Sequence, residues 1–235
     1  MINILVGCEE FQAVCVEFRQ LGFNAYSCDI QEPSGGHPEW HIQRDIFEAI
    51  DAGVPGTGEK WDALIAFPDC TYLTSAGNRW FNEGRYGHEA IDRKKKRIEA
   101  MYFVFRLWSA DIPFISIENP VGFLSKNWMK PSQIIHPWQH GHEASKRTCL
   151  WLKGLPLLEP TEIVGKGEFY YMKTGSGKRY PKSMGTGGVK KRPEFMAITK
   201  GMSREECKKK RSKTFPGIAK AMAGQWGKFL LEVIK

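Results

Sequence analysis

The stretch WDALIAFPDCTYLT, Trp61–Thr74, decides the fold that this sequence predicts. Its segment Asp62–Phe67 is a short apolar run without helical period, which is typical of a buried strand in a parallel sheet covered on both faces. The strand stops at Pro68, which cannot donate to a sheet ladder, and Cys70 follows in a loop. Open α/β sheets bind ligands beyond the carboxyl ends of their strands. A free cysteine is more often a small buried residue, but this position favours a chemical role for the Cys70 thiol.

The composition is that of a soluble globular protein with one core, or with one core and a small appendage. The chain has 235 residues, of which 42% are hydrophobic. No apolar run approaches the ~20 residues of a membrane span. The first residues, MINILVGCEEF, lack the basic region and cleavage site of a signal peptide. Six cysteines without a CxxC pair indicate reduced thiols, so we expect a cytoplasmic protein.

The net charge of +8 indicates a polyanionic partner, most simply a nucleic acid. The positive charge concentrates in Arg93–Arg97, which reads RKKKR, and in the tail Lys173–Lys213. For RKKKR, a solvated helix face and a phosphate contact are equally good interpretations.

The N-terminal residues predict a nucleotide-type binding unit. Asn3–Val6 and Asn24–Ile30 are expected to form strands, with a helix over Glu10–Leu21 between them. Gly7 follows the first strand, and Asp29 lies at the end of the second. An acid about 20 residues beyond such a turn is suited to hold a ribose diol. The turn is not a GxGxxG, and an ordinary strand-end cap stays an alternative role for Asp29.

The remaining elements alternate strands with helices, which predicts the α/β class with a doubly wound, mostly parallel sheet. A strand over Pro113–Ile117 ends at Glu118 and Asn119, so a second strand terminus carries polar groups. The segment Thr71–Gly87 reads as a mobile loop over the site. Glu89–Ser109 is the most convincing helix, and its expected buried side holds Ile91, Ile98, Met101, Tyr102 and Phe105.

Three segments are expected along the chain. Residues 1–156 form the core, 157–202 form a small irregular basic lobe, and 203–235 form C-terminal helices that return to the core. The histidines His136, His140 and His142, with Cys149 downstream, are of the types that bind zinc. Their spacing matches no standard ligand set, so we expect no metal.

The order of these sites resembles that of the DNA cytosine-C5 methyltransferases, particularly small phage and prophage members. The resemblance covers residues 2–156 and about 203–229. No single matching motif is specific, but their shared order is. The matching positions are Leu5-Val6-Gly7 with Phe11, Asp29-Ile30, Asp45-Ile46, Cys70, Glu118-Asn119, Lys146-Arg147 and Thr214–Ala219.

The resemblance implies a Rossmann-like fold, S-adenosylmethionine as cofactor, and DNA or a cytosine nucleotide as partner, in a bacterial or phage-infected cell. The implied catalytic residues are Cys70, Glu118, Asn119 and Arg147. The implied cofactor-binding residues are Leu5, Gly7, Cys8, Glu9, Glu10, Phe11, Asp29, Ile30, Asp45, Ile46, Pro68 and Ala219. The candidates for nucleic-acid contact are Arg79, Trp80, Arg85, Lys146, Lys178, Arg179, Lys190, Lys191 and Arg192.

These residue types suit methyl transfer to a carbon that is a poor nucleophile. Attack of the Cys70 thiolate at C6 of cytosine makes C5 electron-rich. A protonated Glu118 would hydrogen-bond to N3, and burial among apolar residues raises a carboxyl pKa toward that form. Asn119 would orient Glu118, and Arg147 would contact O2. A base inside a duplex must be flipped out to be reached.

The chain departs from the family pattern at four places. Glu9 and Glu10 stand where glycines are usual, and either carboxylate would meet the ammonium group of the cofactor. Asp69 separates Pro68 from Cys70 and opposes thiolate formation by like-charge repulsion. Pro120 stands where a branched apolar residue is usual. At most Leu157–Lys213 is available for recognition of DNA sequence.

Two other functions stay open. A methyltransferase of a free cytosine nucleotide, or of another small cytosine substrate, would need no large recognition domain. A catalytically decayed relative would keep salt-sensitive DNA binding without turnover.

Overall fold

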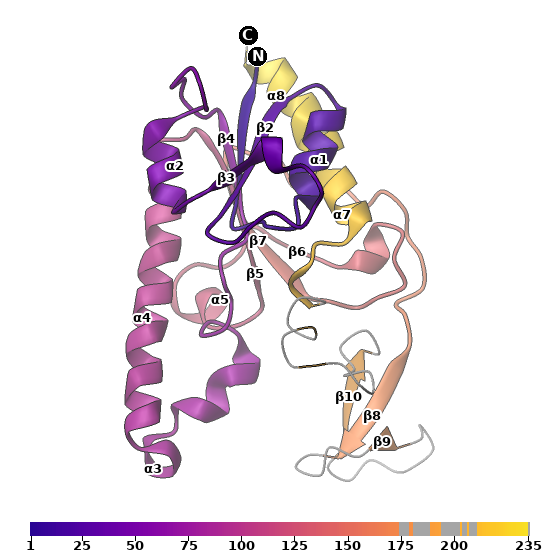
Figure 1. Cartoon of the computed structure of the whole chain (residues 1–235). Helices are drawn as coiled ribbons and strands as arrows, with labels where there is room; N and C mark the ends of the chain where they lie inside the picture. Colours follow the sequence, from indigo (N-terminus) through magenta and orange to yellow (C-terminus); the bar gives the residue numbers. More distant parts are fainter. Residues whose placement is uncertain (174–178, 181–188, 194–202, 204–205, 207–210, 235) are drawn as a thin grey trace.

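The computed structural model describes residues 1–173, 179–180, 189–193, 203, 206 and 211–234. Its centre is a seven-stranded sheet in the order β3-β2-β1-β4-β5-β7-β6, with helices on both faces (Figure 1). The strands are β1 (Asn3–Gly7), β2 (Asn24–Asp29), β3 (His41–Gln43), β4 (Ala63–Ala66), β5 (Phe114–Pro120), β6 (Gln133–Ile135) and β7 (Thr148–Lys153). The predicted α/β class and mostly parallel sheet are confirmed. The sheet is consistent with a Rossmann-like fold.

The first five strands of this order are parallel, and β7 runs antiparallel to both β5 and β6. The chain order reverses between β1 and β4, which lie side by side. In doubly wound sheets, a ligand crevice opens at this reversal, outside the carboxyl ends of the strands. The amide of Phe67, one residue beyond β4, donates to the carbonyl of Gly7 at 2.9 Å, so these two strand ends stay together.

Two helical layers cover the sheet (Figure 1). Helices α1, α7 and α8 lie on one face, and α2 and α4 lie on the other. Alternation along β1 supplies both cores, because Ile4 and Val6 pack against the first layer while Leu5 packs against the second. The helices are α1 (Ala13–Gln20), α2 (Ile46–Ala52), α3 (Glu83–Tyr86), α4 (His88–Trp108), α5 (Leu124–Asn127), α7 (Pro216–Ala221) and α8 (Gly227–Val233), with a π-helical turn, Met222–Trp226, between the last two.

The buried side predicted for the longest helix is wrong. Along α4, Ile98 is 67% exposed and Tyr102 is 64% exposed, while Ala90, Val104 and Leu107 are buried. Only the second half of α4 packs on the sheet, because this 21-residue helix, about 31 Å long, is longer than the strands. The first half instead packs against the segment that follows Cys70.

The irregular lobe predicted for residues 157–202 contains a small antiparallel sheet. Its order is β10-β8-β9, formed by Phe169–Lys173 (β8), Arg179–Tyr180 (β9) and Val189–Pro193 (β10). No clear period is visible in this stretch of sequence, because these strands span five residues or fewer. The three-residue strands β3 and β6 escaped prediction for the same reason. Within the described part of the chain, none of the helices combines the length and apolar character that a membrane span requires.

The C-terminal helices pack closely on the core, as the predicted return of residues 203–235 implies. The indole of Trp226 donates to the carbonyl of Pro156 at 2.9 Å. The amide of Gly217 donates to Nε2 of His142 at 2.8 Å. A Cβ atom at position 217 would lie 1.8 Å from the carbonyl oxygen of His140. Only glycine fits this contact without a backbone shift.

We therefore expect Gly217→Ala to lower the free energy of unfolding by about 2–3 kcal/mol, because the added methyl group overpacks a backbone contact. Urea denaturation measures this change. Gly224→Ala is the matched control, since a Cβ at this helical position meets no atom within 4 Å. That substitution should raise stability by up to about 1 kcal/mol. Equal effects of the two substitutions would contradict the packing described here.

Candidate active site

Cys70 begins a tight turn directly beyond β4. The carboxylate of Asp69 accepts hydrogen bonds from the amide of Thr71 at 2.9 Å and from its hydroxyl at 2.6 Å. The amides of Leu73 and Thr74 donate to the Cys70 carbonyl at 3.0 and 2.9 Å. The turn therefore presents a partly exposed thiol at the carboxyl edge of the sheet.

The loops that follow β4 and β5 are joined by hydrogen bonds. The side-chain Nδ2 of Asn119 donates to the carbonyl of Pro68 at 2.9 Å. Farther along, the amide of Phe123 donates to the carbonyl of Leu73 at 2.7 Å. A Cβ at Gly122 would lie 2.2 Å from that same carbonyl oxygen, so glycine permits the two loops to meet. These contacts fix Cys70 relative to the end of β5.

Glu118 faces a narrow pocket at this edge of the sheet. Partial burial raises the pKa of Glu118, and the neighbouring Lys146 and the Thr148 hydroxyl oppose that rise. The carboxyl therefore holds its proton more firmly than an exposed glutamate. The pocket is lined by Phe67, Glu118, Lys146, Thr148, Thr214, Phe215, Ile218 and Met222.

The same two ionisable groups act on Cys70. Burial raises the pKa of the Cys70 thiol to about 11, and the carboxylates of Glu118 and Asp69 add to the rise while Lys146 opposes it. The thiol, the carboxyl and the ammonium group thus lie within electrostatic reach of one another. The free protein holds Cys70 as a thiol at neutral pH.

Lys146, and not Arg147, faces this pocket. Side chains alternate along an extended chain, so Lys146 and Thr148 share one side while Arg147 takes the other. Arg147 is exposed, and its charge helps burial to lower the pKa of His136. Lys146 therefore lines the pocket, whereas Arg147, the residue predicted to be catalytic, does not. The sequence alone did not show which of these two side chains faces the site, because both residues precede β7, which begins at Thr148.

The neighbouring end of β1 gathers acidic side chains. Cys8 has a left-handed backbone with φ of 58°, and its amide donates to the Cys28 carbonyl at 2.7 Å. Burial raises the Cys8 pKa, and Asp29, Asp45 and Asp69 raise it further, so these carboxylates surround the sulfur. These four side chains come from the ends of β1, β2, β3 and β4 or from the residues that follow them.

Two predicted cofactor positions have open surroundings. The half-buried Asp29 carboxylate accepts the Gln31 amide at 3.0 Å, and the Ile30 side chain beside it is 74% exposed. An exposed Asp45 caps α2 by accepting the amide of Phe47 at 2.8 Å. An apolar side chain between two carboxylates suits a nucleoside, which has both a flat apolar face and polar edges.

The two glutamates predicted to meet an ammonium group are engaged elsewhere. The Glu9 carboxylate accepts the amides of Val14 and Cys15 at 2.7 and 3.2 Å, so it caps α1. Burial raises the pKa of Glu9 to about 8, although these helix amides lower it. The Glu10 carboxylate accepts a hydrogen bond from the hydroxyl of Ser34. The sequence missed the cap because α1 begins at Ala13, three residues after its expected start.

Other predicted cofactor residues are parts of the core. Leu5 is fully buried, and Ala219 is 1% exposed. Ile46 is 4% exposed and packs on Gly7, where a Cβ would lie 2.8 Å from its Cδ1 atom. Pro68 is buried and holds Asn119 through its carbonyl. These residues are buried behind the carboxyl edge and are not exposed at its surface.

Phe11 meets the returning C-terminal segment. Its ring centroid lies 5.5 Å from the ammonium nitrogen of Lys213. Lys213 directly precedes Thr214 and Phe215 of the narrow pocket. The predicted cofactor-binding residue Phe11 and the segment Thr214–Ala219, which resembles the family, therefore lie close together.

The histidine cluster anchors the same returning segment. His142 accepts the amide of Gly217 through Nε2, and its ring centroid lies 5.4 Å from that of Phe215. Nδ1 of His140 lies 3.2 Å from the hydroxyl of Thr161. Over the residues that the structure describes, no group of three or more His, Cys, Asp or Glu side chains is arranged to hold a metal ion.

The segment predicted to be a mobile loop forms two helical turns. A 3₁₀ helix over Ser75–Phe81 leads into α3, and both lie against the first half of α4. Arg97 donates to the Tyr72 carbonyl at 2.8 Å, and its guanidinium lies 3.4 Å from the ring centroid of Phe81. Its NH2 group donates to Oδ1 of Asn78 at 2.8 Å. Part of RKKKR therefore supports this segment instead of facing solvent.

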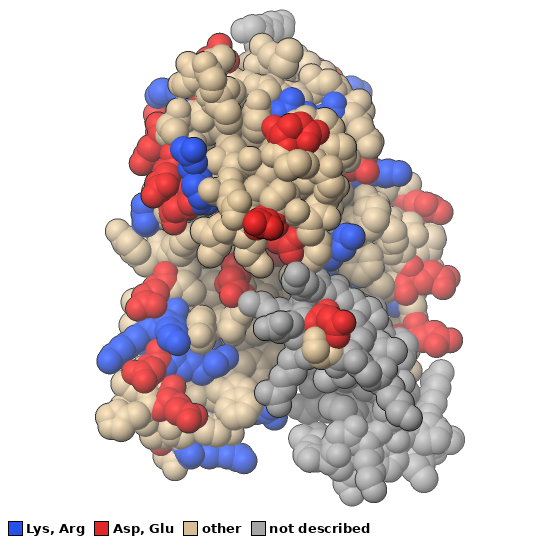
Figure 2. All heavy atoms as spheres, viewed as in Figure 1, with Lys and Arg blue, Asp and Glu red and all other residues tan. Residues whose placement is uncertain are grey.

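Exposed aromatic and basic side chains cover the end of this segment. Arg79 stacks over Trp80 at 4.6 Å, and Trp80 lies 4.9 Å from Tyr86, over which Arg85 lies at 5.4 Å. Figure 2 shows further Lys and Arg side chains over the first half of α4, with Asp and Glu among them. Three of the four nucleic-acid candidates before the basic lobe, Arg79, Trp80 and Arg85, thus form one surface.

The remaining basic candidates lie in the small sheet or beyond it. Arg179 is in β9, and Lys190, Lys191 and Arg192 are in β10. Lys178 lies outside the described residues. The first half of α4 with α3 lies on one side of the carboxyl edge, and the small sheet lies on the other (Figure 1).

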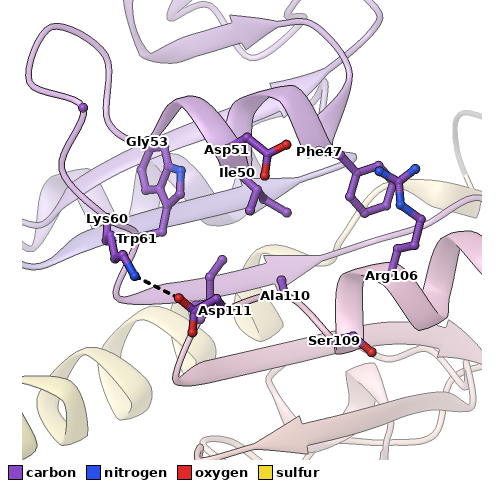
Figure 3. Close-up of a pocket in the computed structure, with 12 residues that line it drawn as sticks. Phe47, Ile50, Asp51, Gly53, Lys60, Trp61, Arg106, Ser109, Ala110 and Asp111 are labelled. Atoms are coloured by element: carbon purple, nitrogen blue, oxygen red, sulfur yellow. Dashed lines mark hydrogen bonds and ion pairs between the residues drawn. The ribbon is translucent and has the colours of Figure 1, made fainter.

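A second pocket, of about 430 Å³, opens at the opposite edge of the sheet (Figure 3). Lys60 and Trp61 precede β4, while Asp111 precedes β5, so this pocket lies at the amino ends of the strands. Its rim carries an exposed ion pair, in which Nζ of Lys60 lies 2.8 Å from Oδ2 of Asp111. The predicted site residues that the structure describes do not line it.

Comparison of the chain with protein-family models and with curated proteins found no match. The function proposed below therefore rests on the geometry of the carboxyl edge.

We expect Arg97→Met to loosen residues 71–87, because it removes two hydrogen bonds and a cation–π contact. Hydrogen exchange of peptides from this segment, followed by mass spectrometry, should accelerate about tenfold. Lys95→Met is the control, since that exposed ammonium lies 3.8 Å from Asp92 in a surface pair. Exchange that accelerates equally in both variants would count against this support.

Proposed function

We propose that the chain transfers a methyl group from S-adenosylmethionine to C5 of cytosine in DNA, through a covalent bond between Cys70 and C6. One observation carries the proposal. A thiol, a carboxyl with a raised pKa and an ammonium group lie within electrostatic reach of one another at the carboxyl ends of β4 and β5 and the amino end of β7. Beside them lies the edge formed by Asp29, Ile30 and Asp45. This combination suits nucleophilic attack on a pyrimidine next to a nucleoside-type cofactor.

The residues of this edge fit the adenosine half of S-adenosylmethionine. Asp29 would accept the ribose hydroxyls, the exposed Ile30 would cover an adenine face, and Asp45 would accept the adenine amine. Gly7 and the left-handed Cys8 would form the turn beside the methionine end of the cofactor. Glu9 accepts two amides of α1 and Glu10 accepts the Ser34 hydroxyl, so these contacts orient both carboxylates. When bound, the cofactor supplies a sulfonium-bound methyl group and takes back the electron pair of the S–CH3 bond.

The chain's own residues perform the other steps. Cys70 loses its proton to solvent, and its thiolate forms a bond to C6. The C5=C6 electrons shift toward C4, and N3 takes the proton of Glu118. After C5 has gained the methyl group, solvent removes the C5 proton, the C5=C6 bond re-forms, and the thiolate leaves. N3 then returns its proton to Glu118, and the released thiolate regains a proton from solvent, so the enzyme ends as it began.

Asn119 would support the site from the other face of the sheet. It follows Glu118 along β5, so the two side chains point to opposite faces. Its Nδ2 donates to the Pro68 carbonyl and so would hold the loop that carries Cys70.

Two basic flanks support DNA as the substrate. The stacked Arg79, Trp80 and Arg85 suit unpaired bases and phosphates. The basic residues of β9 and β10 supply charge on the other flank. Comparing methyl transfer to duplex DNA, single-stranded DNA and dCMP, with labelled cofactor and mass spectrometry of nucleosides, tests the proposal. Transfer to dCMP alone would favour the free-nucleotide reaction, and DNA binding without transfer would favour a decayed relative.

Cys70→Ser should abolish methyl transfer and leave cofactor binding intact, because an alkoxide forms far less readily than a thiolate. Calorimetry with S-adenosylmethionine and a methyl-transfer assay measure the two properties. Turnover retained by this variant would exclude the covalent route.

Asp29→Ala should weaken S-adenosylmethionine binding about tenfold or more, since the ribose hydroxyls lose a charged acceptor. Calorimetry gives the dissociation constant directly. Asp51→Ala is the control of equal charge, at the opposite edge of the sheet. An unchanged constant in Asp29→Ala would reject the cofactor position assigned here.

A further inference from the structure

The returning C-terminal segment forms one wall of the narrow pocket in the candidate active site. Thr214, Phe215 and Ile218 of this segment line the pocket together with Glu118. The sequence carries no charged side chain between Thr214 and Ile218. The position of this wall therefore depends on the contacts that fix its backbone and its aromatic ring to the core.

His142 holds the centre of this wall. The amide of Gly217 donates to Nε2 of His142 at 2.8 Å, and the imidazole centroid lies 5.4 Å from the ring centroid of Phe215. A Cβ atom at position 217 would lie 1.8 Å from the carbonyl oxygen of His140, so the two backbones touch at this point. A change in the bond from Gly217 to His142 therefore acts directly on residues that line the pocket.

The bond requires the neutral form of His142. A backbone amide offers one proton and accepts none, so Nε2 must be the acceptor and Nδ1 must carry the ring proton. A proton that binds to Nε2 takes the same lone pair, and it would place two N–H groups opposite each other at 2.8 Å. Histidine is the side chain whose unperturbed charge change falls between about pH 5 and 8. The bond is thus present while His142 is neutral, and it is lost as the pH falls and the ring takes up its second proton.

We propose that His142 is a pH-dependent positioning residue, which holds the wall of the candidate pocket at neutral pH and releases it in acid. His142 contacts the returning segment and does not itself line the pocket, so it acts through Phe215 and Gly217. The inference adds regulation to the same site and rests on the proposed function for its biological meaning. One proton is exchanged with solvent, and no bond between heavy atoms forms or breaks.

His140 is the nearest other histidine, and it resists protonation. Its side chain is buried, and its Nδ1 atom lies 3.2 Å from the hydroxyl of Thr161. Burial lowers the pKa of His140, and the charge of His142 lowers it further. Protonation of His142 therefore opposes a second proton on His140, and a single proton is enough to break the contact with Gly217.

The charged groups around this contact come from three parts of the chain. Glu143 directly follows His142 and is exposed. The carboxylate of Glu162 lies beside the preceding Gly141, where a Cβ would be 2.6 Å from Oε2. On the returning segment, the ammonium group of Lys213 extends toward the ring of Phe11. All of these groups stay in place in the variants used below, so their charges are common to every comparison.

Nuclear magnetic resonance of the whole chain, labelled with nitrogen-15, tests the contact without catalysis. The titration runs from about pH 4.5 to 8.5, which spans the range in which histidine changes charge. At the upper end, the ring nitrogens of His142 should show the tautomer that carries its proton on Nδ1. As the pH falls, the ring signals of His142 and the amide signal of Gly217 should shift with one common midpoint. Exchange of the Gly217 amide, relative to its rate in an unstructured peptide at the same pH, should accelerate about fivefold to tenfold across that midpoint.

Two variants separate the acceptor from its charge. In His142→Gln, the side-chain oxygen takes the place of Nε2 and accepts without titrating, so the Gly217 amide should stay protected over the whole pH range. In His142→Ala, the acceptor is removed, and the amide should exchange quickly at every pH. Should His142→Ala fail to fold, the comparison of wild type with His142→Gln is sufficient. A ring proton on Nε2 at high pH, or a Gly217 amide that does not follow His142, would overturn the inference.

Methyl-transfer rates then connect the contact to the proposed function. The ratio of the wild-type rate to the His142→Gln rate should fall as the pH drops through the common midpoint, because the other groups of the site titrate in both proteins. A constant ratio would overturn the regulatory role of His142. Absence of methyl transfer by both proteins at every pH would instead refute the proposed function, and the common midpoint of His142 and Gly217 would stand.

Discussion

The hydrogen bond from the Asn119 side chain to the Pro68 carbonyl is the constraint on which the site depends. It joins the ends of β4 and β5 and is buried, so its loss would leave an unpaired carbonyl in the protein interior. Gly122 allows the next residues of both loops to touch. These contacts tie the loop that carries Cys70 to the end of β5, where Glu118 lies.

The environment of Cys70 favours the thiol over the more reactive thiolate. Burial and two neighbouring carboxylates raise the thiol pKa to about 11, which protects the free protein against alkylation and oxidation. A bound base would exclude water and share the proton of Glu118. The sequence indicated repulsion by Asp69, and the structure shows that the Asp69 carboxylate is also tied to Thr71. Asp69 therefore stabilises the turn and also adds negative charge near the Cys70 sulfur.

The sequence predicted strand ends well and side-chain directions less well. Cys70, Glu118 and Asp29 follow short apolar runs, and parallel strands bring such ends to one edge. Lys146 and Arg147 precede a strand whose antiparallel direction the sequence does not reveal, so the choice between them needed coordinates. The face of α4 was wrong because periodicity treats Ile98 as buried and Arg97 as exposed. Arg97 instead packs flat on Phe81 and Phe123, which only a guanidinium can do while remaining charged.

The basic lobe leaves and rejoins the core at almost the same point. The hydroxyl of Ser145 donates to the carbonyl of Lys166 at 2.7 Å, and the next residue, Lys146, binds the carbonyl of Arg211. Two adjacent residues therefore clamp both ends of the intervening chain. An insertion with neighbouring ends can change in length or sequence at small entropic cost to its host. Chimeras that exchange residues 167–210 as a cassette would thus keep the clamp, and evolution has the same freedom to vary the segment that this core carries.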